Sequence, residues 1–228
     1  MSFMKDWKRG VGAVFHPDQN TKSGMSIGRS LALYYQFSVF PFIAFVVIAS
    51  LVLHFGAATM STVPFLSLFS NYMYSVVAVV LSAVLLFWVL VPIGIFINAA
   101  IYHLVGNYFL RVWKGDYSRT FMAVVLGDLP LILFYWLVPV PILGILVLAV
   151  FTIWNVVVLT IALSNSQKVS RLASIGVIFV SVAVMLLIVF MIMAFSSASL
   201  LSLYGPSILS GSGGAAGAAG AGTMIPYP

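Results

Sequence analysis

Asp128 is the one acidic residue of this chain that lies inside a long hydrophobic run, in the segment 126–130 (Leu-Gly-Asp-Leu-Pro). An ionisable side chain within a membrane-spanning segment is costly, and it is a candidate functional residue by default. Asp128 stands about eight residues in from Thr120, which is about 12 Å along a helix. Such a residue can belong to a proton or substrate pathway, or it can fix helix packing through a hydrogen bond.

Neutral polar residues lie at a comparable depth in the other hydrophobic runs. The sequence therefore predicts a polar layer in the inner half of the bilayer, formed by Asp128, Asn98, Asn155, Ser38 and Ser181. No Lys or Arg reaches this layer, and an isolated carboxylate there would cost about 2.5–3.5 kcal/mol on insertion scales. We expect the neutral acid, donating a hydrogen bond to Asn98 or Asn155, with a structural role favoured over a transport pathway.

No other set of residues predicts catalysis, so we expect no enzymatic activity, no cofactor and no metal. The sequence contains no Glu and no Cys, which excludes disulfides and thiol chemistry. His16, His54 and His103 fall in different parts of the chain and do not share a metal in the predicted topology. The many serines have no candidate base beside them.

The charged residues predict how the chain is oriented in a membrane. Ten Lys and Arg and four Asp make fourteen charges, and all except Asp128 fall into three clusters. The clusters are Lys5, Asp6, Lys8, Arg9, Asp18, Lys22 and Arg29; then Arg111, Lys114, Asp116 and Arg119; then Lys168 and Arg171. Short cytoplasmic loops hold the excess of Lys and Arg. The pattern therefore places the N-terminus inside and the C-terminus outside, after five crossings.

The composition excludes a water-soluble fold. The chain has 228 residues, of which 63% are hydrophobic and 6% are charged, and its mean hydropathy is +1.18. A soluble domain carries about 25% charged residues. The net charge of +6 comes from the three clusters. It indicates attraction to anionic lipid headgroups, and the clusters are too short for a nucleic-acid partner.

Five hydrophobic runs predict an all-α, polytopic membrane protein with five transmembrane helices. The runs cover about 31–55, 72–105, 120–138, 142–163 and 172–195, each long enough to span the bilayer. The predicted domains are a cytoplasmic lead-in (1–30), a five-span membrane domain (31–204) and a Gly/Ala-rich outer tail (205–228). The lead-in has apolar residues at helical spacing, which indicates a short interfacial helix or, equally, a frayed basic end.

Three features of the runs and loops lead to further expectations. Pro41 predicts a kink or break in the first span. The second run is about ten residues too long for one straight crossing, so Pro92 predicts a bend or a helix that projects past the inner face. The aromatic inner loop, with Trp113 and Tyr117, and the Gly/Ala tail both have the character of contact surfaces for other membrane subunits or for a second copy.

The layout from Asn98 to Phe195 resembles the Yip (Ypt-interacting protein) domain family of five-span membrane proteins in its compact prokaryotic form. The resemblance rests on these short motifs: 97–104 (INAAIYHL), 115–121 (GDYSRTF), Pro130, the Pro139/Pro141 turn, Trp154 and 164–171 (SNSQKVSR). Val14-Phe15-His16-Pro17 before the first span agrees with it. The resemblance implies five helices, an inside N-terminus and no catalytic residues.

The sequence leaves three classes of function open. The first is a non-enzymatic structural, accessory or membrane-organising protein of a prokaryotic cytoplasmic membrane, whose partners are the bilayer and other membrane subunits. The second is a small transporter or channel that uses Asp128. The third is a trafficking adaptor that recruits a GTPase through its inner loops, which eukaryotic Yip-domain proteins suggest. The Asp-Leu-Tyr-Gly-Pro motif of those proteins is absent from the lead-in.

Overall fold

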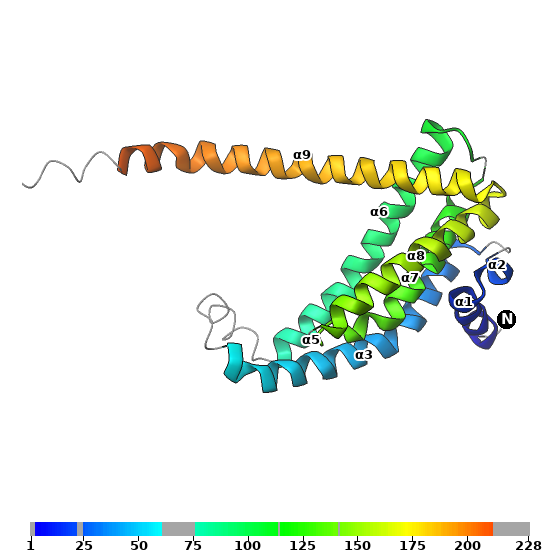
Figure 1. The fold of residues 1–228 in the computed structure, drawn as a ribbon, viewed down its shortest axis with the longest axis horizontal. Helices are drawn as coiled ribbons and strands as arrows, with labels where there is room; N and C mark the ends of the chain where they lie inside the picture. Colours follow the sequence, from blue (N-terminus) through cyan, green and yellow to red (C-terminus); the bar gives the residue numbers. More distant parts are fainter. Residues whose placement is uncertain (1–2, 22–24, 61–75, 114, 141, 212–228) are drawn as a thin grey trace, which may run out of the picture. The chain divides into compact units, whose positions relative to one another are not determined.

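The computed structural model describes residues 3–21, 25–60, 76–113, 115–140 and 142–211, and the regular secondary structure in these ranges is helical (Figure 1). The α-helices are α1 (Phe3–Phe15), α2 (Pro17–Asn20), α3 (Ile27–Met60), α5 (Val76–Val84), α6 (Val91–Leu104), α7 (Tyr117–Phe134), α8 (Leu143–Gln167) and α9 (Arg171–Gly211). The π-helices η1 (Leu85–Leu90) and η2 (Val105–Phe109) and the 3-10 helix η3 (Tyr135–Leu137) extend them. The predicted all-α class is confirmed for these residues.

Five helical stretches in this part of the chain are long and apolar enough to cross a membrane. They are Ile27–Val52, Val77–Phe109, Tyr117–Leu137, Leu143–Gln167 and Arg171–Ser196. The shortest of them has 21 residues, which at 1.5 Å per residue is about 31 Å. That length matches a hydrocarbon core of about 30 Å. The helices are therefore those of a multi-pass membrane protein, as predicted.

The helices extend past the predicted hydrophobic runs at several ends. α3 has 34 residues and passes through Pro41, so the alternative that this proline breaks the first span is wrong. α9 has 41 residues and continues well beyond the run that predicted it. Inside a membrane every backbone polar group must be satisfied within the protein. A helix that continues through Ser, Thr and Gly meets this requirement, whereas a break does not.

The second hydrophobic run forms one helical stretch with a π turn beside a proline. The backbone N–H of Val91 donates to the carbonyl of Leu86, five residues earlier. In the same register the carbonyl of Phe87 would take its hydrogen bond from Pro92, which has no N–H. The Phe87 carbonyl therefore needs a donor from elsewhere, because an unpaired backbone group in a membrane costs several kcal/mol.

Two consecutive tyrosines of α3 supply donors at this π turn. The hydroxyl of Tyr34, which is fully buried, donates to the carbonyl of Phe87. The hydroxyl of Tyr35 lies 3.3 Å from the carbonyl of Trp88. The long second helix is thus joined to α3 at the point where its own hydrogen bonding is interrupted. Where the sequence predicted a bend or a projecting helix at Pro92, the structure has a π turn directly before this proline.

Backbone contacts divide the chain into two compact units, Met1–Ser181 and Val182–Pro228. In the first unit α7 is the central helix, because it packs against α8, α3, α6 and α1. Figure 1 shows α7 and α8 running side by side. From Thr120 to Pro130 every residue of α7 is buried except Asp128. In the second unit, the residues of α9 from Leu186 to Ser196 are all exposed.

A glycine permits the close approach of α7 and α8. A Cβ atom added to Gly127 would lie 2.9 Å from the Cβ of Leu159 and 3.1 Å from its Cα. Small residues at helix interfaces let two backbones come together in a membrane. Because Gly127 directly precedes Asp128, the same contact brings the carboxyl group close to α8.

The lead-in helix α1 is present and packs against the membrane helices. Its residues Ala13 and Val14 are buried in one apolar cluster with Phe37 of α3 and Met122 of α7. Trp7 stacks on Phe37 with ring centroids 4.2 Å apart. Part of the apolar face of the predicted amphipathic helix is therefore covered by protein.

Candidate functional site

Asp128 lies on α7, eleven residues after Tyr117, where the helix begins. Its neighbours Gly127 and Leu129 are buried, while Asp128 itself keeps partial exposure. At 1.5 Å per residue it is about 16 Å from the start of the helix. It therefore lies near the middle of a span about 31 Å long, deeper than the sequence estimate from Thr120.

Asp128 is hydrogen-bonded to the neighbouring helix α8. The side-chain amide of Asn155 donates to Oδ1 of Asp128 at 2.8 Å. The sequence predicted a contact of Asp128 with Asn98 or Asn155, with the acid as the donor, and the partner in the structure is Asn155. The structure has the contact with the opposite direction, because a carboxyl oxygen accepts from the amide N–H. This bond joins α7 and α8 close to the contact at Gly127.

A cavity of about 190 Å³ lies beside Asp128, between η1, α6, α7 and η3. Its lining consists of Leu86, Phe87, Val91, Asn98, Asp128, Leu131, Ile132 and Tyr135. Asp128 and Tyr135 are seven residues apart, so the cavity extends about 10 Å along α7. Asn98 and Asp128 thus share one mostly apolar chamber with the aromatic ring of Tyr135.

The structure brings together part of the predicted polar layer. Asp128, Asn155 and Asn98 meet around the hydrogen bond and the cavity. Ser38 is fully buried, and its hydroxyl donates to the carbonyl of Tyr35 in its own helix at 3.0 Å. Ser181 is also fully buried, and its hydroxyl has no partner among the described residues. Neither serine hydrogen-bonds to the amide and carboxyl cluster.

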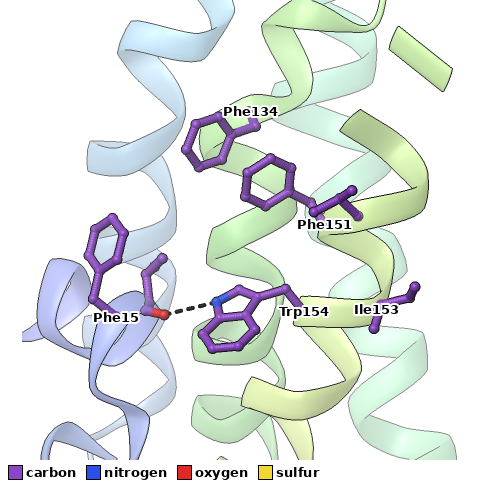
Figure 2. Close-up of a pocket in the computed structure, with 7 residues that line it drawn as sticks. Phe15, Phe134, Phe151, Ile153 and Trp154 are labelled. Atoms are coloured by element: carbon purple, nitrogen blue, oxygen red, sulfur yellow. Dashed lines mark hydrogen bonds between the residues drawn. The ribbon is translucent and has the colours of Figure 1, made fainter. Parts of the chain in front are cut away.

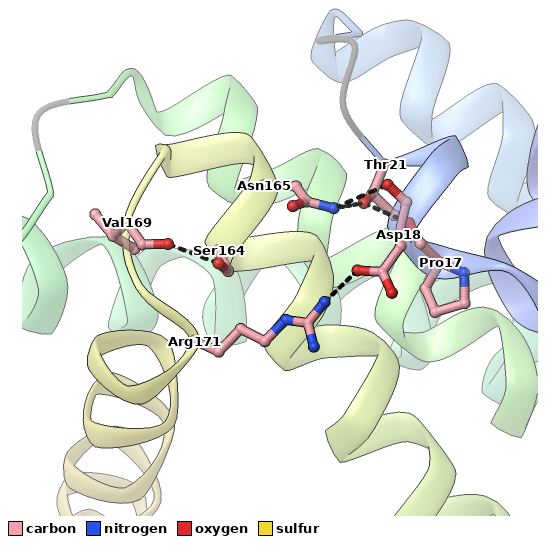
Figure 3. A network of polar contacts seen from close by, with 7 residues as sticks. All are labelled: Pro17, Asp18, Thr21, Ser164, Asn165, Val169 and Arg171. Carbon is pink, nitrogen blue, oxygen red and sulfur yellow. Dashed lines mark hydrogen bonds and ion pairs between the residues drawn. The ribbon is translucent and has the colours of Figure 1, made fainter.

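A second polar site, absent from the predicted site residues, joins the lead-in to the end of α8 and the start of α9 (Figure 3). Arg171 forms an ion pair with Asp18 at 2.6 Å, and both side chains are more than half exposed. The amide of Asn165 lies 2.8 Å from Oγ1 of Thr21, which donates to the carbonyl of Pro17 at 2.7 Å. The first and third charge clusters therefore meet at one end of the helices.

The second charge cluster lies at this same end. Thr120 at the start of α7 accepts from the side-chain amide of Gln167, at the end of α8, over 2.9 Å. Nδ1 of His103, near the end of α6, is 3.2 Å from the same hydroxyl. A Cβ atom on Gly115 would collide with the side chain of Gln167. The loop that holds the second charge cluster thus lies beside the end of α8. The third charge cluster, Lys168 and Arg171, follows that end directly in the sequence.

Trp113 does not form the exposed contact surface that the sequence predicted. Its side chain is 1% exposed, because the loop after η2 folds back and places the indole on Gly106. The backbone N–H groups of Val112 and Trp113 both donate to the carbonyl of Gly106, at 2.9 and 3.1 Å. Tyr117 is half-buried and donates to the carbonyl of Phe96 at 3.1 Å. The exposed aromatic residues here are instead Tyr108 and Phe109.

An apolar pocket of about 450 Å³ separates the lead-in from the middle of α8 (Figure 2). Its lining residues are Val14, Phe15, Phe134, Val150, Phe151, Ile153 and Trp154. The rings of Phe134 and Phe151 stack at 3.9 Å. The indole N–H of Trp154 donates to the carbonyl of Val14 at 3.0 Å, in the last turn of α1. Trp154 was one of the residues behind the family resemblance, but nothing in the sequence indicated that its side chain hydrogen-bonds to the lead-in helix α1.

No cluster of three or more His, Cys, Asp or Glu side chains able to hold a metal occurs among the described residues. The side chain of His54 lies outside what the structure describes. The predictions that concern the tail from position 212 onward also lie outside the described residues. Of the predicted site residues, one carboxyl and two amides are thus brought together beside a cavity.

Comparisons with known proteins give no family for this chain. It matches no family model, no curated protein and no solved structure. The resemblance to Yip-domain proteins remains a prediction from the short motifs. Any proposal of function must accordingly come from the helices, the Asp128 cluster and the exposed surfaces themselves.

Proposed function

We propose that the protein is a non-enzymatic integral membrane protein with a structural or accessory role, which associates with other membrane subunits. The length and exposure of α9 are the observation behind this proposal. α9 has 41 residues, or about 61 Å at 1.5 Å per residue. A hydrocarbon core of about 30 Å covers only half of that length.

The part of α9 beyond Ser196 continues past the candidate span Arg171–Ser196 and needs another environment. Within that span, residues 186–195 are exposed and, apart from Ala194, large and apolar, with Phe190 72% and Phe195 77% exposed. A helix that is apolar all round is normally buried in lipid or against other helices. No charged residue occurs after Arg171 to direct the rest of α9 into water. Lipid or a partner helix covers residues 186–195, and contact with a partner subunit gives the rest of α9 an environment other than water.

The orientation belongs to the same proposal. The N-terminus lies in the cytoplasm of a prokaryotic cell and the C-terminus outside, since the three charge clusters gather at one end of the helices and the positive-inside rule makes that end cytoplasmic. A Yip-like architecture has the same orientation. Cysteine introduced at Ser170, an exposed position in the same loop as Ser166, should stay unlabelled by an impermeant reagent in intact cells, whereas cysteines at Ser61 and Ser212 should be labelled. Equal labelling at all three positions would refute this orientation.

The accessory role is tested by the mass of the native complex. The full chain and a variant that ends after Ser196 are expressed in the native membrane and purified in mild detergent. We expect the full chain in a complex larger than one copy, and the truncated chain as a folded monomer that loses only the helical signal of the deleted part of α9, because the span Arg171–Ser196 is complete. Identical masses for both forms would contradict the role of the distal half of α9.

A small transporter or channel is the second candidate, and the cavity beside Asp128 favours it. The Asp128→Asn variant separates the two candidates, because it keeps an acceptor for the amide of Asn155 and removes only the ability to ionise. In a structural protein this change should shift the free energy of unfolding by less than about 0.5 kcal/mol. In a transporter it should abolish flux in proteoliposomes while stability is retained.

A further inference from the structure

The cavity beside Asp128 contains two polar side chains with unused hydrogen-bonding capacity. Oδ1 of Asp128 accepts from Asn155, while Oδ2 has no donor among the described residues. The amide of Asn98 lines the same cavity and likewise forms no hydrogen bond with them. Polar groups in an apolar interior cost free energy unless they are paired. Both side chains therefore favour a polar guest in the cavity.

The charge of the site limits what that guest can be. Asp128 is the only charged residue that lines the cavity, and one other titratable group, a phenol, lines it. This titratable phenol in the lining belongs to Tyr135. One carboxylate in a low-dielectric site is neutralised by one positive charge. The site thus suits a monovalent ligand.

The donor atoms and the volume indicate the chemical class of this ligand. Carboxylate and amide oxygens are the hard ligands preferred by hard cations rather than by transition metals. The cavity of about 190 Å³ has room for a small cation together with several water molecules, each with about 30 Å³ of liquid volume. A large organic cation is disfavoured, because the cavity is small and its lining is polar only at Asp128, Asn98 and Tyr135.

The helix irregularity beside the cavity is a second, independent observation. Leu86 and Phe87 of the π turn form part of the lining. π turns occur frequently at functional sites, and membrane transporters place their cation sites near the bilayer midplane beside interrupted helices. Asp128 lies about midway along its span, so its depth agrees with such a site.

We propose that the cavity between η1, α6 and α7 binds one small monovalent cation, of the Na+ or Li+ class, through the Asp128 carboxylate and the Asn98 amide oxygen. This inference rests on the proposed membrane placement and is independent of the accessory role. A proton on Asp128 is the competing means of neutralisation. Cation binding therefore keeps the carboxyl group ionised at a pH where the empty site would be protonated.

The test measures how fast a hydrophobic fluorescent carbodiimide modifies Asp128, since this reagent reacts with protonated carboxyl groups in apolar surroundings. The purified full chain is labelled at one fixed pH in choline chloride, NaCl, LiCl or KCl of equal ionic strength. The modified residue is identified by mass spectrometry. At a Na+ concentration ten times the dissociation constant, about one site in eleven is free, so we expect labelling to slow about tenfold.

Two variants show whether the slowing comes from this site. Asn98→Ala should still be labelled at Asp128 but should lose the protection by Na+. Ser38→Ala is the matched control, because this serine lies in the predicted layer but bonds within its own helix, and it should keep full protection. Equal labelling rates in choline and Na+, or full protection in Asn98→Ala, would overturn the proposal.

A thermal measurement covers the case in which a variant is poorly folded. Na+ should raise the unfolding midpoint of the unmodified protein, because a ligand that binds only the native state stabilises it. The Asp128→Asn variant should show no such rise relative to choline. An equal rise in both proteins would mean that the salt acts elsewhere, and would overturn the site at Asp128. Identical masses in the truncation experiment, which would refute the accessory role, would leave this cation result unaffected.

Discussion

The hydrogen bond from Tyr34 to the Phe87 carbonyl should matter only because Pro92 leaves that carbonyl without a donor. Tyr34→Phe removes the hydroxyl and keeps the buried ring. A buried acceptor left unsatisfied costs about 1–3 kcal/mol, while side-chain hydrogen bonds measured in membrane proteins average about 0.6 and reach about 1.7 kcal/mol. We expect a loss of about 1–2 kcal/mol, or roughly a 5- to 30-fold change in the folding equilibrium.

The same substitution in a Pro92→Ala background should cost much less. Alanine restores a backbone N–H in position to donate to the Phe87 carbonyl, so the tyrosine hydroxyl becomes dispensable. A double-mutant cycle should therefore give a coupling free energy of about 1 kcal/mol between Tyr34 and Pro92. Tyr35→Phe is the matched control. Its hydroxyl makes a longer, exposed contact of 3.3 Å with the Trp88 carbonyl, and its loss should cost less than about 0.5 kcal/mol.

The assay is reversible unfolding of the purified variants in mixed detergent micelles, followed by helical circular dichroism and by tryptophan fluorescence. Coincident transitions from the two probes justify a two-state treatment. An equal loss from Tyr34→Phe with and without Pro92 would refute the explanation, because the hydroxyl would then act independently of the proline. Equal losses at Tyr34 and Tyr35 would contradict the assignment of the buried bond as the stronger one.

Three further predictions concern packing and the lead-in. Gly127→Ala should lower the free energy of unfolding by about 1–3 kcal/mol, because the new methyl group overlaps Leu159. Gly94→Ala is its control and should be nearly neutral in the same assay, because no atom lies within 4 Å of a Cβ added there. Trp154→Phe should expose the lead-in to limited proteolysis, because it removes the hydrogen bond from the indole N–H to the Val14 carbonyl and leaves only a smaller aromatic ring. Asp18→Asn should change stability by less than about 1 kcal/mol because the pair with Arg171 is largely exposed, and a larger loss would show that this pair does more than a surface ion pair.

Most of the helical framework follows from hydropathy alone. Runs of about twenty apolar residues leave the backbone no alternative to a helix inside a bilayer, so the five spans are visible in the sequence. Helix ends are less predictable, because Ser and Gly neither require nor forbid another turn in such surroundings. That is why α9 continues to Gly211, past Gly205 and Pro206, where the apolar pattern fades.

Contacts between distant segments are predictable only when the residue type leaves few alternatives. Asp128 needs a polar partner in the membrane, and few neutral polar residues lie at its depth, so its contact with Asn155 could be predicted. Trp113 is different, because an aromatic residue in a charged loop is equally consistent with an exposed surface. Its burial depends on the absence of a side chain at Gly106, seven residues earlier, which hydropathy does not reveal.

The π turn shows how a local defect becomes a tertiary constraint. Pro92 removes one N–H, and the i+5 register of Val91 and Leu86 assigns that loss to the carbonyl of Phe87. In water the exposed carbonyl would bind solvent, and no partner helix would be required. In hydrocarbon the only available donors are side chains of neighbouring helices, so the position of Tyr34 on α3 fixes how α3 meets η1. Because η1 also lines the cavity beside Asp128, a change at Tyr34 or Pro92 should alter that cavity although neither residue lines it.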